Sequence, residues 1–234
     1  ANMVIGSLVN NETLILTGAG SMADRNVGTN KVVDPTGFQL LNGTGPRAGL
    51  ASNYAFTGGS QTVSITPAAL TITSSNVSKT YDGTTSTANA STAPLAIVKA
   101  GSNTQLFGSD SLTGGTFTFV SPNVGRDANG GVANDRAVTV SGVSVADGNN
   151  GANYVVTYAN NTTSRIDPYS VTITALPQSR VYNGTTGAGS TAFVTSALIG
   201  SDSVSQVTLT YDTKNVALGS KVITPSAAVV ATGT

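Results

Sequence analysis

The sequence predicts an all-β protein, and three observations carry this prediction. Val, Ile and Thr are abundant, and their β-branched side chains fit a pleated strand better than a helix. Glycine occurs 27 times beside many asparagines, and both residue types supply the positive-φ turns that short strands need. Short segments alternate apolar and polar residues, as along 137–145. We therefore expect many short strands joined by Gly and Asn turns.

The strands of the middle part can be placed in order from their residue patterns. Residues 116–120 alternate phenylalanine with threonine, and residues 137–145 alternate valine with threonine and serine around a β-bulge at Gly142. The full series of expected strands is 71–73, 116–120, 137–145, 154–158 and 163–166. Several short strands within about 100 residues, with turns between them, are typical of an immunoglobulin-like β-sandwich.

The composition argues against catalysis and against nucleic-acid binding. The 234 residues include no His, Cys or Trp, so imidazole bases, thiol nucleophiles, disulfides and Cys/His zinc sites are excluded. Charged residues make up 9%, with 11 basic and 11 acidic side chains, whereas phosphate binding needs clustered Lys and Arg. No apolar run is long enough to span a bilayer. We expect no enzymatic activity, no nucleic-acid partner and no membrane span in this segment.

Several sequence markers recur at a spacing close to 100 residues. The prolines of the Ile-x-Pro marker, Pro67 and Pro168, lie 101 residues apart, and the Tyr-x-Gly-Thr-Thr markers have the same spacing. The markers are Ile-x-Pro at 65–67 and 166–168, Tyr-x-Gly-Thr-Thr at 81–85 and 182–186, Asn-Tyr at 53–54 and 153–154, and Asn-Val-Gly or Asn-Val-Ala at 26–28, 123–125 and 215–217. Agreement among independent markers at one period indicates tandem repeats.

The markers divide the chain into a partial repeat at 1–68, a complete repeat at 69–168 and a partial repeat at 169–234. The first lacks the opening third of the unit, and the last lacks the closing strand. Partial sandwiches would leave strand edges unpaired, so we expect a segment of a longer repetitive protein, or missing strands that come from a neighbouring chain. The linkers at Pro67 and Pro168 are short and stiff, which predicts tandem sandwiches arranged as a rod.

These markers resemble the YDG-type repeats of large bacterial surface and secreted adhesins, including filamentous-haemagglutinin-like proteins. The resemblance rests on the Tyr-Asp-Gly-Thr-Thr, Asn-Val-Gly, Val-Thr-Val-Ser-Gly, Asn-Tyr and Ile-Asp-Pro markers of 69–168, and it covers the whole chain with partial matches at each end. The last repeat departs from the pattern, because Asn183 replaces the Asp and Ala217 the Gly. The resemblance implies an extracellular β-sandwich stalk that lifts an adhesive region from the cell surface or joins a biofilm matrix. It brings no catalytic residues.

The recurring tyrosines and asparagines are interpreted as structural residues. Tyr81 and Tyr182 precede an Asp-Gly or Asn-Gly turn. This position favours a buried ring that pins the turn, with its hydroxyl on a backbone partner, over a platform for carbohydrate stacking. Asn53 and Asn153 are expected in turns, with side chains bonded to nearby backbone. The tyrosines that follow them, at 54 and 154, are expected to start the next strand.

Oxygen-rich loops are the places where calcium would find ligands. Calcium takes about six to eight oxygens, but no twelve-residue calcium loop is present and the carboxylates are few. Asp127 and Asp135 as a glycosidase-like acid and base are less favoured still, because the Gly and Asn around them indicate a flexible, solvated hairpin. We expect no catalytic, cofactor-binding or metal-binding residues, with calcium left open at Asp127, Asn129, Asn134, Asp135, Asp147 and Asn149.

Two covalent modifications are also compatible with the residue types. An isopeptide bond between a buried Lys and an Asn, beside a carboxylate, would stand in for disulfides, and Lys79 or Lys99 could supply its amine. The spacing singles out no such triad. Asn-x-Ser/Thr triplets accept glycans in secreted eukaryotic proteins, but a Thr- and Asn-rich bacterial chain produces them by chance. The triplets begin at Asn11, Asn42, Asn76, Asn89, Asn160, Asn161 and Asn183.

Three functions follow, in decreasing order of support. We expect first a structural stalk or fibre segment of an extracellular bacterial adhesin or biofilm matrix protein, whose partners are adjacent repeats and whose neutral faces limit electrostatic sticking. The second is a module that binds glycan or matrix polysaccharide through Tyr rings and Asn amides. The third is a filament subunit whose end repeats are completed by strands of neighbouring copies. Each places the protein outside the cell or on the bacterial surface.

Overall fold

The structure consists almost entirely of β-strands. The computed structural model describes residues 5–57, 59–90, 92–101, 105–231 and 233. Within these residues, two 3-10 helices of three residues each, η1 (Val9–Asn11) and η2 (Ala51–Asn53), are the only helical elements. The predicted all-β class is therefore confirmed. Neither of the helices in the described residues is long and apolar enough to cross a lipid bilayer.

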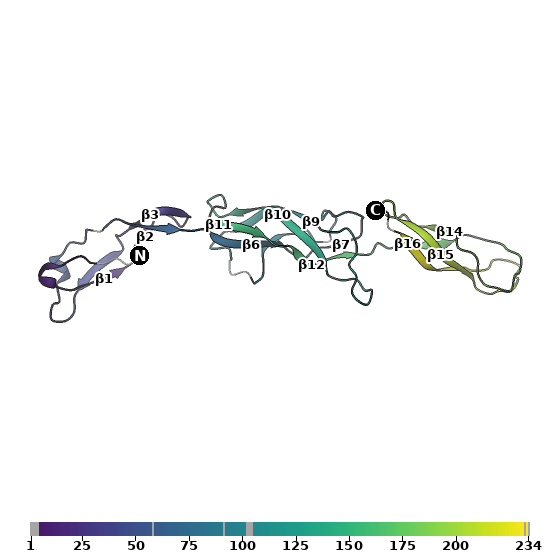
Figure 1. Cartoon of the computed structure of the whole chain (residues 1–234), viewed down its shortest axis with the longest axis horizontal. Helices are drawn as coiled ribbons and strands as arrows, with labels where there is room; N and C mark the ends of the chain where they lie inside the picture. Colours follow the sequence, from purple (N-terminus) through teal and green to yellow (C-terminus); the bar gives the residue numbers. More distant parts are fainter. Residues whose placement is uncertain (1–4, 58, 91, 102–104, 232, 234) are drawn as a thin grey trace. The chain divides into compact units, whose positions relative to one another are not determined.

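The chain divides into two compact units, and Figure 1 shows the strands of both. The first unit comprises Ala1–Thr73, Ala96–Gly115 and Ser141–Ala159, and the second comprises Ser74–Leu95, Thr116–Val140 and Asn160–Thr234. Both units therefore take residues from the predicted middle repeat. We refer to 1–68, 69–168 and 169–234 as the first, middle and third stretches; their boundaries as repeats stay a prediction.

The first unit contains small sheets that are mostly antiparallel. Their strands are β1 (Leu14–Gly18), β2 (Ser21–Met22), β3 (Gly28–Asp34), β4 (Phe38–Asn42), β5 (Gln61–Ile65), β6 (Ala68–Ser74), β8 (Ala96–Val98) and β11 (Tyr154–Tyr158). β1 pairs with β4, β3 lies between β2 and β5, and β6 lies between β11 and β8. β5 is thus an edge strand, and β6 pairs with β11 in parallel.

The second unit contains one larger sheet and two strand pairs in its described residues. Its strands are β7 (Ser78–Thr80), β9 (Ser111–Phe119), β10 (Arg136–Ala146), β12 (Asn161–Asp167), β13 (Ile173–Ala175), β14 (Phe193–Thr195), β15 (Ser203–Tyr211) and β16 (Ile223–Ala231). The sheet has the order β7-β12-β10-β9, and the pairs are β13-β14 and β15-β16. β9 and β10 contribute residues to both units.

Two apolar clusters form the core of the second unit. The cluster of the middle stretch is completely buried, with each member at most 1% exposed, and its members are Val77, Phe119, Val138 and Ile166. Tyr81 and Val124 pack against it from outside. The cluster of the third stretch consists of Ala188, Val207, Leu209 and Tyr211. In the first unit, Leu70 and Ile72 of β6 are fully buried.

β10 keeps both of its predicted valine pairs buried. Val138 and Val140 are buried, and so are Val143 and Val145, although the second pair is out of step with the first. Because side chains alternate between the two faces of a strand, one extra residue must be accommodated between the pairs. Gly142 lies there with a φ of +64°, a conformation that glycine adopts without strain. The glycine therefore allows the strand to accommodate the extra residue between the two pairs.

The two Asn-Tyr markers have different local structures. Tyr154 starts β11, as predicted. Tyr54 does not start a strand, because its amide closes η2 by donating to the Ala51 carbonyl at 3.1 Å, and its hydroxyl donates to Glu12 at 2.9 Å. The next strand begins only at Gln61. The prediction was therefore wrong for Tyr54, whose bonds tie it to the helical turn.

Candidate load-bearing site

Parallel strand pairs join the opening and closing strands of the middle stretch. In the first unit, β6 pairs with β11, and Leu70 lies opposite Val156. In the second unit, β7 pairs with β12, and Lys79 lies opposite Ile166. β6 and β7 come early in the middle stretch, whereas β11 and β12 come late. Each pair therefore joins an early strand of the middle stretch to a late strand of the same stretch.

This arrangement determines how each pair responds to tension along the chain. In a parallel pair, the start of the earlier strand and the end of the later strand lie at opposite ends of the pair. A force that separates these two points acts along both strands in opposite directions and loads the hydrogen bonds of the ladder together. An antiparallel hairpin pulled at its open end loses its bonds one at a time. The parallel geometry of β6·β11 and β7·β12 therefore favours resistance to stretching.

Side-chain hydrogen bonds lengthen the β7·β12 contact before β7 begins. Asn161 Nδ2 donates to the Ser74 carbonyl at 2.9 Å. The Val77 amide donates to Ser164 Oγ at 3.1 Å, and Ser164 is only 1% exposed. A buried hydroxyl in this position satisfies an amide that would otherwise be costly to bury. The contact between the opening and closing segments is therefore longer than the strand ladder alone.

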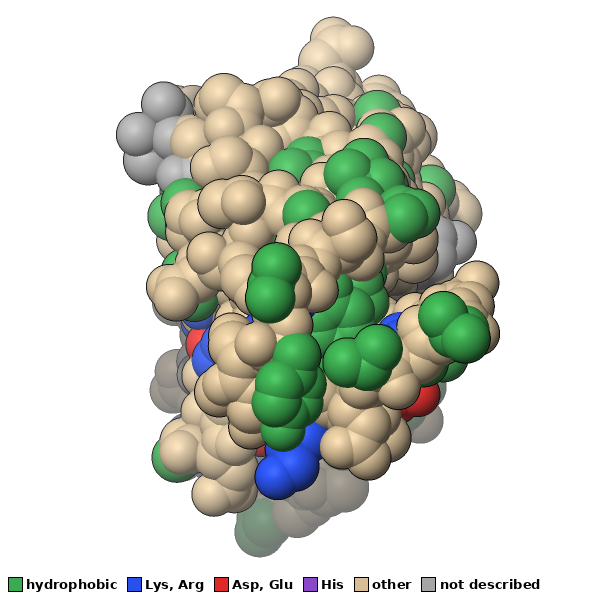
Figure 2. Space-filling view, turned by 90° about the vertical axis from the view of Figure 1, so that its right-hand side faces the viewer, with side chains coloured by type: hydrophobic (Ala, Val, Ile, Leu, Met, Phe, Trp, Pro, Cys, Tyr) green, Lys and Arg blue, Asp and Glu red, His purple; other side chains and the backbone are tan. Residues whose placement is uncertain are grey.

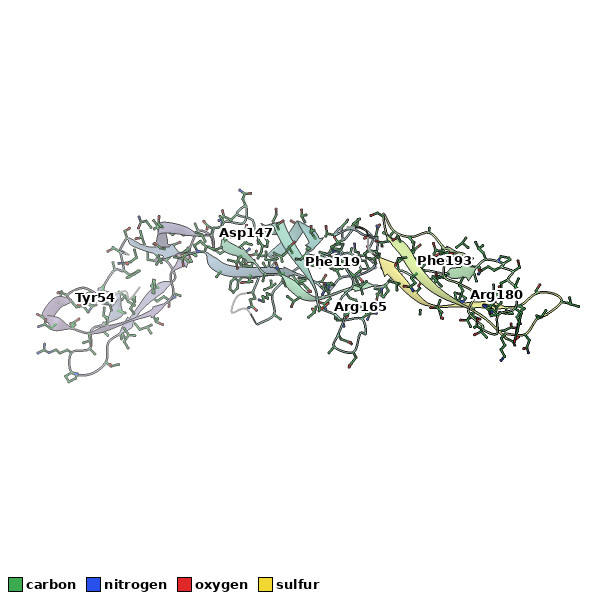
Figure 3. The ribbon with its side chains drawn as sticks, turned by 45° about the vertical axis from the view of Figure 1, so that its right-hand side comes forward. Tyr54, Phe119, Asp147, Arg165, Arg180 and Phe193 are labelled. Atoms are coloured by element: carbon green, nitrogen blue, oxygen red, sulfur yellow. The ribbon has the colours of Figure 1, made fainter. Side chains whose placement is uncertain are left out.

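A buried ammonium group fastens the turn that follows β7. Lys79 is 2% exposed, and its Nζ donates to Asp82 Oδ1 at 2.7 Å, to the Thr84 carbonyl at 2.6 Å and to the Ser86 carbonyl at 3.0 Å. The same atom lies 5.5 Å from the centroid of the Phe119 ring, which Figure 3 labels in the middle stretch. A buried charge is tolerated when it is paired and hydrogen-bonded. Lys79 meets both conditions and ties the turn to the apolar cluster.

The same turn keeps Asp82 ionised. Burial alone would raise the pKa of Asp82, but hydrogen bonds from Lys79, Thr84 and Asn89 outweigh it and lower the pKa to about 2. The Thr84 amide donates to Asp82 Oδ1 at 2.9 Å. Gly83, between them, has a φ of +74°, which residues with a Cβ rarely adopt. The predicted Asp-Gly turn is present, and its carboxylate acts as an acceptor for the turn and as the counter-ion of Lys79.

The third stretch has a similar set of contacts, here called the fastening as for Lys79, in which a different cation donates to the carbonyls of the turn. Arg180 lies 101 residues after Lys79, donates to the carbonyls of Thr185 and Gly187, and lies 5.1 Å from the centroid of the Tyr211 ring. These carbonyls follow those of Thr84 and Ser86 at the same spacing of 101 residues. This arrangement was not predicted from the sequence, because Lys79 was considered without Arg180. The signal was the cation at the same spacing as the tyrosine marker.

Within the first unit, the Asn-Val-Gly marker meets the Asn-Tyr marker. The Val27 amide donates to Asn153 Oδ1 at 2.9 Å, and Asn153 Nδ2 donates to Asn26 Oδ1 at 3.0 Å. Arg25 forms an ion pair with Asp110 beside them. We call this set of five residues the joint. The prediction that Asn153 bonds nearby backbone is wrong, because these partners lie 126 and 127 residues away in the chain.

Two aspartates stabilise the loops at the joint: Asp110, which belongs to it, and Asp147, which holds the neighbouring loop. Asp147 is 3% exposed, and its Oδ1 accepts from the amides of Asn149 and Gly151 at 2.7 and 2.8 Å. Burial opposes its ionisation, but the backbone N–H groups outweigh burial and lower its pKa. Asp110 accepts from the Tyr154 hydroxyl at 2.7 Å. Burial, followed by the hydrogen bond to Asp110, raises the pKa of Tyr154.

The second unit uses a matching aspartate. Asp202 lies 92 residues after Asp110, in a second Gly-Ser-Asp sequence. It lines a cavity of about 350 Å³ together with Tyr81 and Arg126. Burial raises the pKa of Tyr81, and the charge of Asp202 and a hydrogen bond to it raise it further. Tyr81 therefore lies beside the Asp202 carboxylate in this cavity.

The aspartates of the loops left open for calcium form local hydrogen bonds and an ion pair. Asp127 Oδ1 accepts from the amides of Asn129 and Gly131 in its own turn. Asp135 pairs with Arg136, whose side chain lowers the pKa of that carboxyl. A lowered pKa does not suit the general acid of the alternative Asp127/Asp135 pair. Over the described ranges, no group of three or more acidic side chains is placed to hold a metal ion.

Tyr182 and Lys99 are exposed to solvent, although the sequence predicted a buried ring for Tyr182 and offered Lys99 for a buried isopeptide bond. Tyr182 is 57% exposed, so the prediction of a buried ring is wrong there, because no described strand pairs with residues 179–181. Tyr81, in contrast, is half-buried against the core. Lys99 is exposed and does not suit a buried isopeptide bond. Lys79 is buried, and its Nζ donates to Asp82 and to the Thr84 and Ser86 carbonyls.

Five of the Asn-x-Ser/Thr asparagines have side-chain hydrogen-bond partners among the described residues: Asn42, Asn76, Asn89, Asn161 and Asn183. Asn42 Oδ1 accepts from the Ala51 amide at 2.8 Å, and Asn161 contacts Ser74 as described above. The triplet of Asn89 ends at Ser91, which lies outside the described residues. These side chains therefore contribute to local structure without any modification.

Comparison with known proteins gives one match, to a family. The sequence pattern of the YDG domain matches residues 1–63 and 66–163. Neither the curated proteins nor the solved structures include a significant match to this chain. The two matched segments together cover more than half of the 234 residues.

Proposed function

The chain belongs to the YDG domain family, and from this premise we propose that it is a structural segment of an extracellular bacterial stalk or fibre. In this role, it transmits tension and has no catalytic activity. The observation that carries the proposal is the pair of parallel strand contacts, β6·β11 and β7·β12, which join the opening and closing strands of the middle stretch. The parent protein would be an adhesin or a biofilm matrix protein of the filamentous-haemagglutinin-like kind.

The proposal includes a finer architecture. Each stretch of about 100 residues would be one immunoglobulin-like sandwich, and successive sandwiches would form a rod on short linkers at Pro67 and Pro168. Supporting this arrangement, the joint is polar and specific: Asn26, Val27 and Asn153 share hydrogen bonds, and an ion pair lies beside them. A joint of this kind limits bending between repeats without a large apolar interface.

Small-angle X-ray scattering of the 234-residue chain tests the rod. We expect a pair-distance distribution with a long tail, as an elongated particle gives. The variant Arg25→Ala, which removes the exposed partner of the ion pair with Asp110, should keep the fold but increase the flexibility seen in the Kratky plot. A compact, symmetric distance distribution for the wild-type chain would contradict the proposal.

A further inference from the structure

Four asparagines of the chain are followed directly by glycine, and an Asn-Gly pair is where an asparagine side chain loses ammonia most readily. Because glycine has no Cβ, its backbone nitrogen can approach and attack the side-chain carbonyl carbon of the asparagine before it. The pairs begin at Asn42, Asn129, Asn150 and Asn183. The local sequence makes the four pairs alike, and the fold makes them different.

In three of the pairs, a hydrogen bond holds the glycine nitrogen. The bonds are 2.8 to 3.0 Å long and run from the Gly43 amide to the Gly49 carbonyl, from the Gly130 amide to the Asp127 carbonyl, and from the Gly151 amide to Asp147 Oδ1. A nitrogen held in this way must lose its hydrogen bond before it can turn towards the asparagine side chain. The fold therefore protects these three asparagines.

The glycine of the fourth pair has no such bond. Within the described residues, nothing accepts a hydrogen bond from the Gly184 amide, and a Cβ placed on Gly184 would meet no atom within 4 Å. The tip of the matching turn, at Gly83 and Thr84, is also exposed in the middle stretch, where β12 lies beside the preceding strand. The accessibility of Gly184 therefore belongs to the turn itself and does not depend on a neighbouring strand.

Thr185 activates the carbonyl carbon that the Gly184 nitrogen would attack. Asn183 Oδ1 accepts the Thr185 amide at 3.1 Å and the Thr185 hydroxyl at 3.0 Å. Arg180, labelled in Figure 3, donates to the same hydroxyl at 3.2 Å. When a nitrogen adds to Cγ, negative charge develops on Oδ1, and donors already placed on that oxygen stabilise it.

We propose that Asn183 is a self-modification site, at which the turn converts its own asparagine into aspartate. The Gly184 nitrogen forms a bond to Asn183 Cγ, the Cγ–Nδ2 bond breaks, and the proton of that nitrogen leaves with the amide group as ammonia. Water then adds to Cγ of the resulting cyclic imide, whose carbonyl the Thr185 donors polarise. This breaks the new bond to nitrogen and returns a proton to the Gly184 amide. The net change is a gain of water and a loss of ammonia, without oxidation or reduction.

The turn of the middle stretch shows what the product carboxylate would do. There, Asp82 Oδ1 accepts from the Lys79 ammonium at 2.7 Å and from the Thr84 hydroxyl at 2.9 Å. Residues 180, 183 and 185 lie 101 positions after these three. The Thr185 hydroxyl already lies between the Arg180 guanidinium and Asn183 Oδ1.

Conversion at 183 therefore adds the missing counter-ion to the fastening of the third stretch. A carboxylate at this position pairs with Arg180 and strengthens the hydrogen bonds from Thr185, because an ionised acceptor binds donors more tightly than a neutral amide. Figure 2 looks towards the loops of this stretch, and acidic side chains are sparse on the face that it shows. Few like charges on that face oppose a new carboxylate.

Ageing of the whole 234-residue chain in mildly alkaline buffer, folded and in denaturant, tests the site. Peptide mapping by mass spectrometry detects each conversion as a gain of about 1 Da. In denaturant, we expect similar rates at all four pairs. In the folded chain, we expect Asn183 to convert first and the other three to be slowed about tenfold or more, because their hydrogen bonds must open. Electron-transfer fragmentation should identify mainly aspartate, not isoaspartate, at 183.

Three variants test the role of the turn. Thr185→Val removes a donor to Asn183 Oδ1 and should slow conversion at 183 about threefold, with unchanged rates at the other three pairs. Asn183→Asp supplies the product directly. It should slow hydrogen exchange of the Tyr211 amide, which donates to the Thr186 carbonyl, by about threefold. Adding Arg180→Ala to Asn183→Asp should abolish this slowing.

Four results would overturn the proposal. Two concern the folded chain: equal rates at the four pairs, or earlier conversion at any of the other three asparagines. The third is isoaspartate as the main product, because its chain runs through the side-chain carbon and displaces the carboxylate from Arg180. The fourth is unchanged exchange of the Tyr211 amide in Asn183→Asp. The conversion needs only the turn and water, so none of these results bears on the scattering behaviour that tests the proposed function.

Discussion

The middle and third stretches carry the same turn and differ in whether a closing strand covers it. In the middle stretch, β12 lies beside β7, and Lys79 is 2% exposed. In the third stretch, Arg180 has the matching carbonyl partners and a ring beneath it, but Tyr182 is 57% exposed and residues 179–181 pair with no described strand. The comparison teaches that the turn and its cation form locally, whereas burial comes from a strand far along the sequence.

The largest effect is expected from removing the buried isoleucine of β12. Ile166→Ala should destabilise the middle stretch by about 4 kcal/mol, because Ile166 is fully buried and its loss leaves a cavity. Ile65→Ala, at the same marker in the first stretch, should cost about 1.5 kcal/mol, because Ile65 is half-buried on the edge strand β5. Native-state hydrogen exchange measures both free energies. Equal costs would contradict the view that β12 is enclosed on both sides whereas β5 lies at a sheet edge.

The next largest effect is expected from removing the cation of the turn. Lys79→Ala should cost about 3 kcal/mol, because it leaves Asp82 and two carbonyls without a buried partner. Arg180→Ala should cost about 1 kcal/mol or less, since Arg180 is exposed to solvent. Denaturant unfolding, followed by amide hydrogen exchange at β7 for Lys79→Ala and at β15 for Arg180→Ala, measures the two costs separately. An Arg180→Ala cost as large as that of Lys79→Ala would show that β12 contributes nothing to the fastening.

The turn at Asp82 in the middle stretch is expected to lose stability in acid. The matching turn in the third stretch, which has Asn183 at that position, is not. The pKa of Asp82 is about 2 in the folded chain, below the ordinary value of 3.8. Its contribution, about 2 kcal/mol, is therefore present above about pH 4 and is lost as the pH falls towards 2. The neutral Asn183 stands at the matching position.

Unfolding of the wild-type chain and of Asp82→Asn between pH 5 and pH 2 measures this contribution. The free energies of unfolding at β7 should converge as the pH falls, because protonated Asp82 resembles Asn more closely. Parallel curves for the two chains would show that Asp82 does not titrate with a lowered pKa.

The smallest effect concerns the joint. Asn153→Ala should cost about 1 kcal/mol, because the Val27 amide loses its acceptor. Asn53→Ala, at the matching marker in the first stretch, should be nearly neutral because Asn53 is exposed. Exchange of the Val27 amide reads the effect directly. If the Val27 amide is equally protected in Asn153→Ala, the hydrogen bond to Asn153 does not stabilise the joint.

The sequence predicted the local structure better than the long-range contacts. Alternating valines located β10, and the Asp-Gly marker predicted a turn that Asp82 and Gly83 form. These features depend on residues close together in the chain. The hydrogen bonds of Asn153 to Val27 and of Tyr54 to Glu12 could not be predicted from the sequence, because tertiary packing determines such partners.

The candidate site was predictable only in part. The parallel pairing of β7 with β12 leaves no pattern in the sequence, since alternation is the same for parallel and antiparallel neighbours. The cations at 79 and 180 share the period of the tyrosine markers, so a comparison of the stretches residue by residue would have found them. Their burial would still have differed, because it depends on β12.

Stretching single chains in an atomic force microscope, with handles at residues 1 and 234, tests the central claim most directly. The account predicts a discrete unfolding event that releases about 300 Å of chain, the length of roughly 100 extended residues. It also predicts that this event occurs at lower force in Lys79→Ala. A chain that lengthens smoothly without a force peak, or an event that Lys79→Ala leaves unchanged, would contradict the claim that β7·β12 and its fastening carry the load.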